Sequence, residues 1–394
     1  MKIALVCPAS LPATQFGGIL FLCVDIARET ANNENQVTIY TTDLDFANNP
    51  HTFNSDLPKE EMIDNFKIKR SHVWLALRLF FINPGIYFQM MNDSPDIIHT
   101  IGVRSFQSYI AAIVSKKKNI PLIISDQGGL TTHPELKNSG LLGKILYKLQ
   151  TPMVNFIINQ ASKIIVANEY EEKIFLELSS SDKIEKIRNG INLATLKTTT
   201  KNFRAKHNIN IPFALFLGRF SRIKGIDILL DAIKILKNEF KLKDFKFLIM
   251  GVDFGFQNQM LKMIKQYNIE NEIIIIKNPT RDDVIAAYNE TEFLVLPSRW
   301  ELSPLTPLEG FAFKKPTIST NAHGIPSTIT HNENGILIDN EDSNGLAKSI
   351  LELINNKEKC RELGQSGYNL VQTECNAKSM VEKIITIYNQ IVNR

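Results

Sequence analysis

Short apolar runs alternate with longer amphipathic segments along the first half of the chain. Where Ile, Val and Leu follow one another over a few residues, the pattern is typical of a strand that is buried on both faces. Apolar residues that recur at helical spacing separate these runs, most clearly at 19–31. Strands that alternate with helices predict a parallel sheet covered by helices. The strands predicted for this half are residues 2–7, 36–42, 96–99, 121–125 and 163–167.

A polar segment at 193–211, rich in Lys, Thr and Asn, separates this half from a second half with the same pattern. The last amphipathic segment, 377–394, is long enough to cross back onto the first half. We therefore predict an α/β protein with two Rossmann-like domains, at 1–192 and 193–376, followed by this helix. In the second half the predicted strands are residues 213–217, 245–250, 273–276, 292–296 and 317–320, and the predicted helices are residues 226–238, 257–267 and 282–289.

Two further apolar stretches allow more than one interpretation. Residues 141–160 predict a kinked pair of amphipathic helices around Pro152. With Lys144 and Lys148, these helices could rest on a membrane surface through a basic rim, but we favour packing on the core. The apolar stretch 73–91 is interrupted by an arginine and a proline, and no apolar run reaches the roughly 20 residues that a membrane-spanning helix needs.

The composition narrows the class of protein. A hydrophobic content of 44% and a charged content of 22% are typical of a globular protein. A net charge of +4 is too small to indicate a nucleic-acid partner. The four cysteines form no Cys-x-x-Cys motif, which predicts reduced thiols in a cytoplasmic protein. The apolar residues at the start lead directly into Pro8, so we interpret them as a strand rather than a signal peptide.

Two carboxylates lie in the segment that follows the predicted strand 292–296. Pro304 and Pro307 predict an irregular loop, with a short helix beginning only at Glu309. Glu301 and Glu309 would then bracket a loop at the carboxyl edge of a parallel sheet, where such sheets bind ligands. Each glutamate also has an ordinary interpretation, Glu309 as a charge that favours a helix N-terminus and Glu301 as an exposed loop charge.

Two cations lie in another strand-to-helix loop. Arg219 and Lys224 are flanked there by Gly218 and Gly225. The guanidinium fork of an arginine and the point charge of a lysine suit a diphosphate at a helix N-terminus, although solvated loop cations are the alternative. Cations for phosphates and a carboxylate for ribose hydroxyls are the minimal equipment for holding a nucleotide.

A glycine pair follows the first predicted strand. Gly17 and Gly18 precede the helix predicted at 19–31, but they do not form Gly-x-Gly-x-x-Gly, so we predict no NAD site. Glycines at this position let the backbone approach a ligand closely and expose N–H groups at the start of a helix. An ordinary turn is the alternative.

Taken together, these motifs resemble the retaining glycosyltransferases of family four, which have the GT-B fold. The resemblance extends over nearly the whole chain, and the order and spacing of the motifs make it specific. The motifs that carry it are Gly-Arg-x4-Lys-Gly at 218–225, Pro-Ser-Arg-Trp-Glu-x7-Glu at 297–309, Gly17-Gly18, Asp96-Ile-Ile-His99, Arg188-Asn-Gly-Ile-Asn192, Gly324-Ile-Pro326 and Asn334-Gly335-Ile-Leu337.

The resemblance implies a donor sugar that is activated as a nucleoside diphosphate and bound in a cleft between the two domains. Arg219 and Lys224 would neutralise the departing diphosphate, and with Glu301, which would lie against the donor sugar, they are the implied catalytic residues. Glu309 would hold the ribose hydroxyls, and the loop around Pro279 would receive the base. No divalent metal is needed if the two cations supply the charge. The implied donor-binding residues are Gly17, Gly18, Arg219, Lys224, Pro279, Glu301, Ser303, Pro304, Leu305 and Glu309.

The chain departs from the family pattern at two positions. Many relatives have Gly where this chain has Pro304, and proline cannot donate an N–H, so one backbone contact to the donor sugar is expected to be absent or shifted. Many relatives also carry His where this chain has Gln127, which can hydrogen-bond a sugar hydroxyl but cannot act as a base. His133 lies nearby and is a candidate substitute. His99 is open between a contact with the acceptor and packing at the end of a strand.

The sequence thus predicts a cytoplasmic glycosyltransferase of hexosyltransferase type, without a metal or other cofactor. It would move a sugar from a nucleotide-sugar donor to a glycan or lipid-linked acceptor, with peripheral contact at the inner face of the membrane in the latter case. One alternative is a nucleotide-sugar hydrolase or epimerase that has no acceptor. Another is a non-catalytic nucleotide-sugar-binding partner of a transferase, which Gln127 and Pro304 favour.

Overall fold

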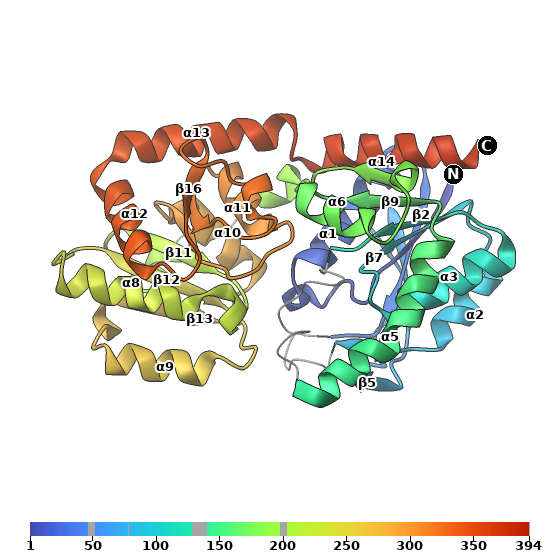
Figure 1. Cartoon of the computed structure of the whole chain (residues 1–394), viewed down its shortest axis with the longest axis horizontal. Coiled ribbons are helices and arrows are strands. Elements are labelled where there is room, and N and C mark those ends of the chain that lie inside the picture. Colours follow the sequence, from blue (N-terminus) through green and yellow to red (C-terminus); the bar gives the residue numbers. More distant parts are fainter. Residues whose placement is uncertain (46–51, 78, 128–139, 198–202, 394) are drawn as a thin grey trace. The chain divides into compact units, whose positions relative to one another are not determined.

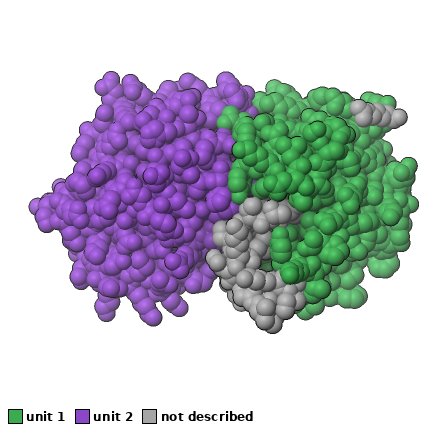
Figure 2. Space-filling view, in the orientation of Figure 1, with its two compact units in different colours: residues 1–190, 377–394 green, residues 191–376 purple. Residues whose placement is uncertain are grey.

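The chain folds into two compact units. The computed structural model describes residues 1–45, 52–77, 79–127, 140–197 and 203–393 (Figure 1). The first unit consists of Met1–Gly190 and Ala377–Arg394, and the second consists of Ile191–Asn376; Figure 2 colours them separately. The last helix therefore belongs to the same unit as the N-terminus, although the second unit separates the two in sequence.

A parallel sheet forms the centre of the first unit. Its strand order is β10-β9-β8-β7-β1-β2-β4-β3, and only β3 runs antiparallel to its neighbour. The chain moves outward from β1 in one direction and from β7 in the other, so the order reverses between these two strands. The strands are β1 (Lys2–Val6), β2 (Gln36–Thr42), β3 (Glu60–Ile63), β4 (Phe66–Ser71), β7 (Ile97–Ile101), β8 (Leu122–Ser125), β9 (Lys163–Val166) and β10 (Ile184–Lys186).

Helices cover both faces of this sheet. Along β7, Ile98 belongs to the core shared with α3 and α5, whereas its neighbour His99 bonds to Tyr388 of α14. Because successive side chains of a strand point to opposite faces, α14 and its neighbour α1 cover the face opposite α3 and α5. A separate hairpin joins β5 (Leu75–Leu77) to β6 (Phe80–Ile82). The helices are α1 (Gly18–Asn32), α2 (Gly85–Asn92), α3 (Phe106–Lys118), α5 (Gly140–Gln160), α6 (Glu169–Leu176) and α14 (Ala377–Val392).

The second unit is built around a wholly parallel sheet with the order β13-β12-β11-β14-β15-β16. Here the order reverses between β11 and β14. The strands are β11 (Phe213–Leu217), β12 (Lys246–Gly251), β13 (Ile273–Lys277), β14 (Leu294–Leu296), β15 (Thr317–Thr320) and β16 (Gly335–Ile338).

Two hydrophobic cores pack the helices of the second unit. The larger core lies between the sheet and α8, α9 and α12, and a smaller one forms where α10, α11 and α13 meet. The smaller core fixes α10 against α11, and both helices carry polar residues of the candidate site. The helices are α7 (Phe203–Lys206), α8 (Ile226–Asn238), α9 (Gln257–Gln266), α10 (Arg281–Glu290), α11 (Leu305–Ala312), α12 (Ser343–Asn355) and α13 (Lys357–Thr373).

The predicted alternation of strands and helices is confirmed, and three local predictions are wrong. The short helix that was expected to begin at Glu309 begins at Leu305 instead, because Pro307 lies in the first turn, where its missing N–H removes no intrahelical hydrogen bond. Residues 140–160 form one helix with Pro152 inside, not a helix pair. The segment 193–211 contains the short helix α7, whose Phe203 is buried in the larger core. No helix of the described residues is long and apolar enough to span a membrane.

Candidate functional site

The loops after β11 and β14 meet where the strand order of the second sheet reverses. β11 pairs with β12 on one side and with β14 on the other. Open parallel sheets bind their ligands at the carboxyl ends of the strands, at such a reversal point. The two sequence motifs that contain Arg219, Lys224, Glu301 and Glu309 follow these two strands. The fold therefore brings both motifs to the position where open parallel sheets bind ligands.

Direct backbone contacts hold these two loops together. A Cβ atom on Gly225 would lie 1.8 Å from the carbonyl oxygen of Pro297, so only glycine permits the approach. Gly225, the N-cap of α8, also has a φ of 69°, in the left-handed region that favours glycine. Two residues away in each loop, the N–H of Arg299 donates to the carbonyl of Ile223 at 2.7 Å. The relative position of the loops is thus fixed by main chain as well as by side chains.

Arg299 strengthens this junction through two acidic residues. Its guanidinium donates to both carboxylate oxygens of Asp227 at 2.7 and 2.9 Å, and it also forms an ion pair with Glu341. Burial lowers the pKa of Arg299, but the hydrogen bonds that Arg299 donates to Glu341 and Asp227 outweigh burial and raise the pKa above its ordinary value. Arg299 therefore serves as a structural cation that ties the loop after β14 to α8.

The junction places Lys224 against Glu301. The ammonium of Lys224 forms an ion pair with Oε1 of Glu301, and the hydroxyl of Ser298 donates to the same oxygen at 3.1 Å. Both side chains are largely but not fully buried, with exposures of 20% and 18%. The aliphatic stem of Lys224 lies against Gly218, since a Cβ atom there would be 3.8 Å from two of its carbons. A cation and a carboxylate thus share one partly water-accessible position at the edge of the sheet.

Arg219 of the same loop lies against an aromatic ring. Its guanidinium carbon lies 4.9 Å from the centroid of the Phe254 ring, at a distance that allows a cation–π contact. The loop that carries Phe254 is attached to the first loop, because the N–H of Phe220 donates to the carbonyl of Val252 at 2.7 Å. Arg219 therefore packs against an aromatic ring, whereas Lys224 is paired with a carboxylate.

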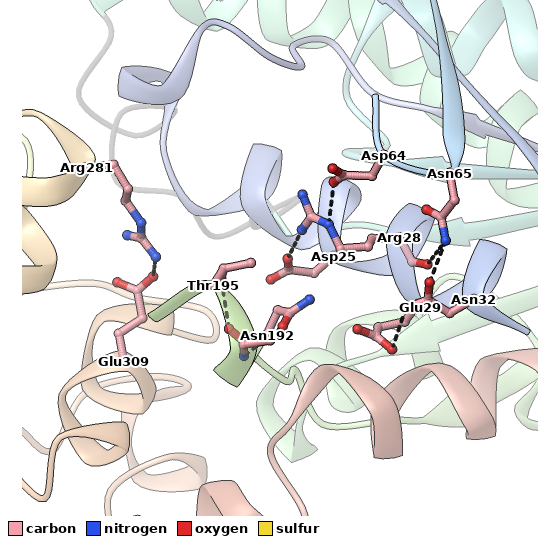
Figure 3. A network of polar contacts seen from close by, with 11 residues as sticks. Asp25, Arg28, Glu29, Asn32, Asp64, Asn65, Asn192, Thr195, Arg281 and Glu309 are labelled. Atoms are coloured by element: carbon pink, nitrogen blue, oxygen red, sulfur yellow. Dashed lines mark hydrogen bonds and ion pairs between the residues drawn. The ribbon is translucent and has the colours of Figure 1, made fainter. Parts of the chain in front are cut away.

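Glu309 lies on α11, but not where the sequence predicted it. It is the fifth residue of that helix, beyond the first turn, so a favourable helix-dipole position does not explain it. It is also 9% exposed, and both carboxylate oxygens are occupied: Arg281 donates to Oε1 at 2.6 Å and Tyr288 donates to Oε2 at 2.7 Å. Figure 3 shows the Arg281 contact. Burial and the neighbouring Glu309 raise the pKa of the Tyr288 hydroxyl well above its ordinary value.

The remaining predicted donor residues of this unit lie in loops at the same sheet edge. Ser303 and Pro304 precede α11, with Pro304 buried at the N-cap, and Leu305 begins the helix. Pro279 is half-buried in the loop between β13 and α10. That loop is anchored by the N–H of Asn278, which donates to the carbonyl of Gly251 at 2.9 Å.

The glycine pair of the first unit lies at the equivalent reversal point of its own sheet. Gly17 has a φ of 113°, and among the described residues no atom lies within 4 Å of where its Cβ would be. Gly18 is the first residue of α1. The backbone therefore adopts a glycine-specific conformation with open space beside it.

Two of the three acceptor-side candidates are described, and the third, His133, lies outside the described residues. Gln127 has a φ of 53° and forms a reciprocal amide pair with Asn189, at 2.9 and 2.8 Å. His99 is fully buried, and its ring nitrogens bond to Tyr388 and Ser125 at 2.7 and 2.8 Å. Burial lowers the pKa of His99 to about 3. His99 is therefore packed inside the first unit, between Ser125 of β8 and Tyr388 of α14.

Sequence reasoning missed Arg281, Tyr288 and Ser298. Arg281 and Tyr288 are seven residues apart, a helical spacing that was visible, but nothing in the sequence indicated which neighbour that face of α10 meets. Ser298 lies within the motif at 297–309, but nothing in that motif indicates that its hydroxyl meets Glu301. Among the described residues, no three His, Cys, Asp or Glu side chains are grouped so that they could hold a metal ion.

Comparison with known proteins gives matches in both units. A model described as Glycosyltransferase Family 4 matches residues 16–195, and a model described as Glycosyl transferases group 1 matches residues 199–370. An uncharacterized glycosyltransferase of Methanocaldococcus jannaschii is 31% identical over 264 residues, which cover 66% of this chain and 66% of that relative. The capsular polysaccharide biosynthesis glycosyltransferase CapM of Staphylococcus aureus is 24% identical over 253 residues, which cover 63% of this chain and 64% of CapM.

The whole chain also resembles solved structures. Anabaena HepE in complex with UDP and glucose superimposes with a TM-score of 0.77 at 16% identity, over 99% of this chain and 100% of that one. At this level of identity the likeness shows the fold, and the protein has the GT-B fold. With family models matching from residue 16 to residue 370, the chain belongs to the glycosyltransferases of family 4, group 1 type. It spans less than two thirds of the length of the two curated relatives named above.

Proposed function

We propose that this protein is a retaining glycosyltransferase, which moves a hexosyl group from a nucleoside-diphosphate sugar to an acceptor hydroxyl without a metal ion. The observation that carries the proposal is the Lys224–Glu301 pair at the reversal point of the second sheet. A cation for the leaving phosphate and a carboxylate for the sugar are there held in one place by the Gly225–Pro297 contact. The printed names of the relatives support a transferase.

The reaction develops opposite charges at two atoms. As the bond between the anomeric carbon and the diphosphate oxygen breaks, negative charge grows on the phosphate and positive charge grows on the sugar ring. Arg219 and Lys224 stabilise the departing diphosphate, and fixed cations do so more strongly in the transition state than in the ground state. The acceptor oxygen attacks the face that the diphosphate leaves, and its proton passes to a diphosphate oxygen. The anomeric configuration is thereby retained.

The other residues bind the donor. Glu309 accepts hydrogen bonds from the ribose, the loop at Pro279 receives the base, and Glu301 lies against the sugar. Backbone groups at Ser303 and Leu305 contact the same sugar, while Pro304 can contribute only its carbonyl. Gly17 and Gly18 approach the donor with their main chain.

A lipid-linked acceptor is favoured over a free glycan by the hairpin β5–β6 of the first unit. Trp74, which precedes β5, and Leu75 and Leu77 within β5 are 73%, 50% and 46% exposed. On its inner side Phe81 contacts Phe16, the residue before Gly17, with ring centroids 6.2 Å apart. An exposed tryptophan beside leucines suits the interface between lipid headgroups and acyl chains. The hairpin would therefore meet the apolar part of the acceptor, or the membrane that holds it.

Vesicle binding tests this part of the proposal. Trp74→Ser should reduce co-sedimentation with vesicles, whereas Phe240→Ser, which removes an exposed apolar side chain from the second unit (39% exposed), should not. If the wild type and both variants sediment to the same extent with and without vesicles, the acceptor is a free glycan.

The transfer itself is tested with nucleotide sugars in the presence of a chelator. Release of the nucleoside diphosphate should depend on an added acceptor, and NMR of the product should show the anomeric configuration of the donor. Diphosphate release at the same rate without an acceptor would instead identify a hydrolase. Donor binding without turnover in the presence of glycan and lipid extracts would identify a non-catalytic binding protein.

A further inference from the structure

Side chains of a single helix hold Glu309 from two sides. Arg281 is the first residue of α10, and Tyr288 follows about two turns later, so both lie on the same side of that helix. Arg281 donates from Nη2 to one oxygen of Glu309 at 2.6 Å, and the Tyr288 hydroxyl donates to the other at 2.7 Å. Each carboxylate oxygen therefore already has one fixed donor.

Burial makes this arrangement rigid. Glu309 is 9% exposed and Tyr288 is fully buried, while the side chain of Arg281, at 29%, still reaches the surface. The Tyr288 ring stacks on Phe313 with centroids 5.9 Å apart. Thr306, one turn before Glu309 on α11, hydrogen-bonds to the Tyr288 hydroxyl. A buried charge whose hydrogen bonds are satisfied contributes more to a defined geometry than to stability.

The arrangement also determines what else Glu309 can accept. An ionised carboxylate has about four acceptor positions, and Arg281 and Tyr288 use two of them. The two that remain, one on each oxygen, can accept from two hydroxyls at once. The cis 2′- and 3′-hydroxyls of a ribose form such a pair of donors, whereas a 2′-deoxyribose offers only one.

We propose that Arg281 is a positioning residue of the donor site. Together with Tyr288 it orients the Glu309 carboxylate toward both ribose hydroxyls, and so makes the site select ribonucleotides over 2′-deoxyribonucleotides. Arg281 acts through Glu309 and does not itself contact the nucleotide. This inference rests on the proposed function, because it assumes that the pocket binds a nucleoside diphosphate.

Titration calorimetry with matched ligand pairs tests the inference. UDP, ADP and GDP are first titrated into the wild-type protein, and the one that binds is compared with its 2′-deoxy form. We expect the ribose form to bind at least about ten-fold more tightly, which corresponds to about 1.4 kcal/mol. In Arg281→Gln the ribose form should lose most of this advantage, while the deoxy form should bind nearly as before. Arg281→Lys, which keeps one charged donor, should restore part of the discrimination.

An arginine of α7 that pairs with the last residue of α10 provides the control. Arg204 pairs with Glu290, the last residue of α10, through Nε at 2.8 Å, so Arg204→Gln removes a similar ion pair at the other end of the helix. The ratio of ribose to deoxyribose affinity in Arg204→Gln should equal the ratio in the wild type. If Arg281→Gln does not fold, the affinities of the ribose and deoxyribose forms are compared in Tyr288→Phe instead.

Three results have different meanings. Equal loss of both affinities in Arg281→Gln, with the ratio unchanged, would overturn the inference, because Arg281 would then be merely structural. If Arg281→Gln bound the ribose form more tightly than the wild type does, the inference would be overturned as well, because Arg281 would then compete with the ribose for Glu309. If the wild-type protein binds none of the nucleoside diphosphates, the proposed function fails and not the positioning role alone.

Discussion

Lys224 and Glu301 form an ion pair although 77 residues separate them in the chain. The pair exists because the backbone of Gly225 lies directly against that of Pro297, which joins the loop after one strand to the loop after its neighbour. In the free protein, Glu301 is therefore the partner of the cation that we expect to bind phosphate. We expect a diphosphate that enters the site to compete with Glu301 for Lys224.

Loss of the Lys224 charge should slow glycosyl transfer strongly. By analogy with the removal of one donor from an oxyanion hole, Lys224→Gln should lower kcat by about 10²–10³-fold. Lys234→Gln, which removes a cation from α8 outside the site, is the matched control and should retain wild-type activity. Steady-state rates with a saturating acceptor provide the measurement. If both variants transferred sugar at the wild-type rate, Lys224 would have no catalytic role.

Glu301→Gln should separate nucleotide binding from transfer. Removing the carboxylate frees Lys224, so a nucleoside diphosphate without a sugar should bind about three-fold more tightly, within the range of a partly exposed ion pair. Transfer should nevertheless be slower, because the charge that faces the sugar is gone. Calorimetry with the diphosphate and rate measurements with the donor test both halves. A parallel loss of affinity and rate would show that Glu301 only supports the fold of the loop.

Gly225→Ala should destabilise the second unit and weaken nucleotide binding together. The new Cβ would collide with the Pro297 carbonyl, so the two loops must separate. Gly255→Ala is the control, because Gly255 also has a positive φ, 90°, but no described atom lies within 4 Å of its Cβ position. Backbone strain alone should cost about 1–3 kcal/mol in either variant, and Gly225→Ala should cost more. Equal unfolding free energies would show that the loops are not held by this contact.

Glu171 should make stability depend on pH. Burial, and then the neighbouring Asp126, raise the pKa of Glu171 from 4.5 to about 8, while the N–H groups of Ala167 and Gln127 oppose the shift. Between these values the folded protein keeps a proton that the unfolded chain releases, so this contribution to stability is lost as pH rises from about 4.5 to about 8. Glu171→Gln removes the contribution.

Urea unfolding near pH 5 and near pH 8 measures this effect. The unfolding free energy of the wild type should fall relative to that of Glu171→Gln over this interval, whereas Glu172→Gln, at a half-buried position of the same helix, should follow the wild type. Curves for wild type and Glu171→Gln that stay parallel would mean that Glu171 titrates alike in the folded and unfolded states.

The sequence was informative where the local pattern determines the structure. The runs at 213–217 and 226–238 are a strand and a helix with the predicted limits, because their apolar residues repeat at the period of the element that they form. The rule that proline excludes a helix misled us at Pro307, because the same residue is tolerated in the first turn. The strand β4 was not predicted, since its alternating Lys and Ile residues carry a weaker signal than a continuous apolar run.

The sequence could not predict which side chains far apart in the chain contact one another. Glu301 and Lys224 were both selected as site residues, but their pairing depends on which strands are neighbours, and the motifs do not specify that. The partners of Glu309 lie on another helix, so its burial and its two fixed donors could not be predicted. His99 was left open for the same reason, because its partner Tyr388 lies 289 residues away in the chain.

The central claim is that a nucleoside diphosphate binds between the loops that follow β11 and β14. A thermal-unfolding panel with UDP, ADP and GDP, run on the wild type, Lys224→Gln and Glu309→Ala, tests it most directly. At a hundred times its dissociation constant, one of these ligands should stabilise the wild type by about 2.7 kcal/mol, and both variants should lose most of that gain. If none of the ligands stabilises the wild type, or if both variants are stabilised as much as the wild type is, the donor site is not where we place it.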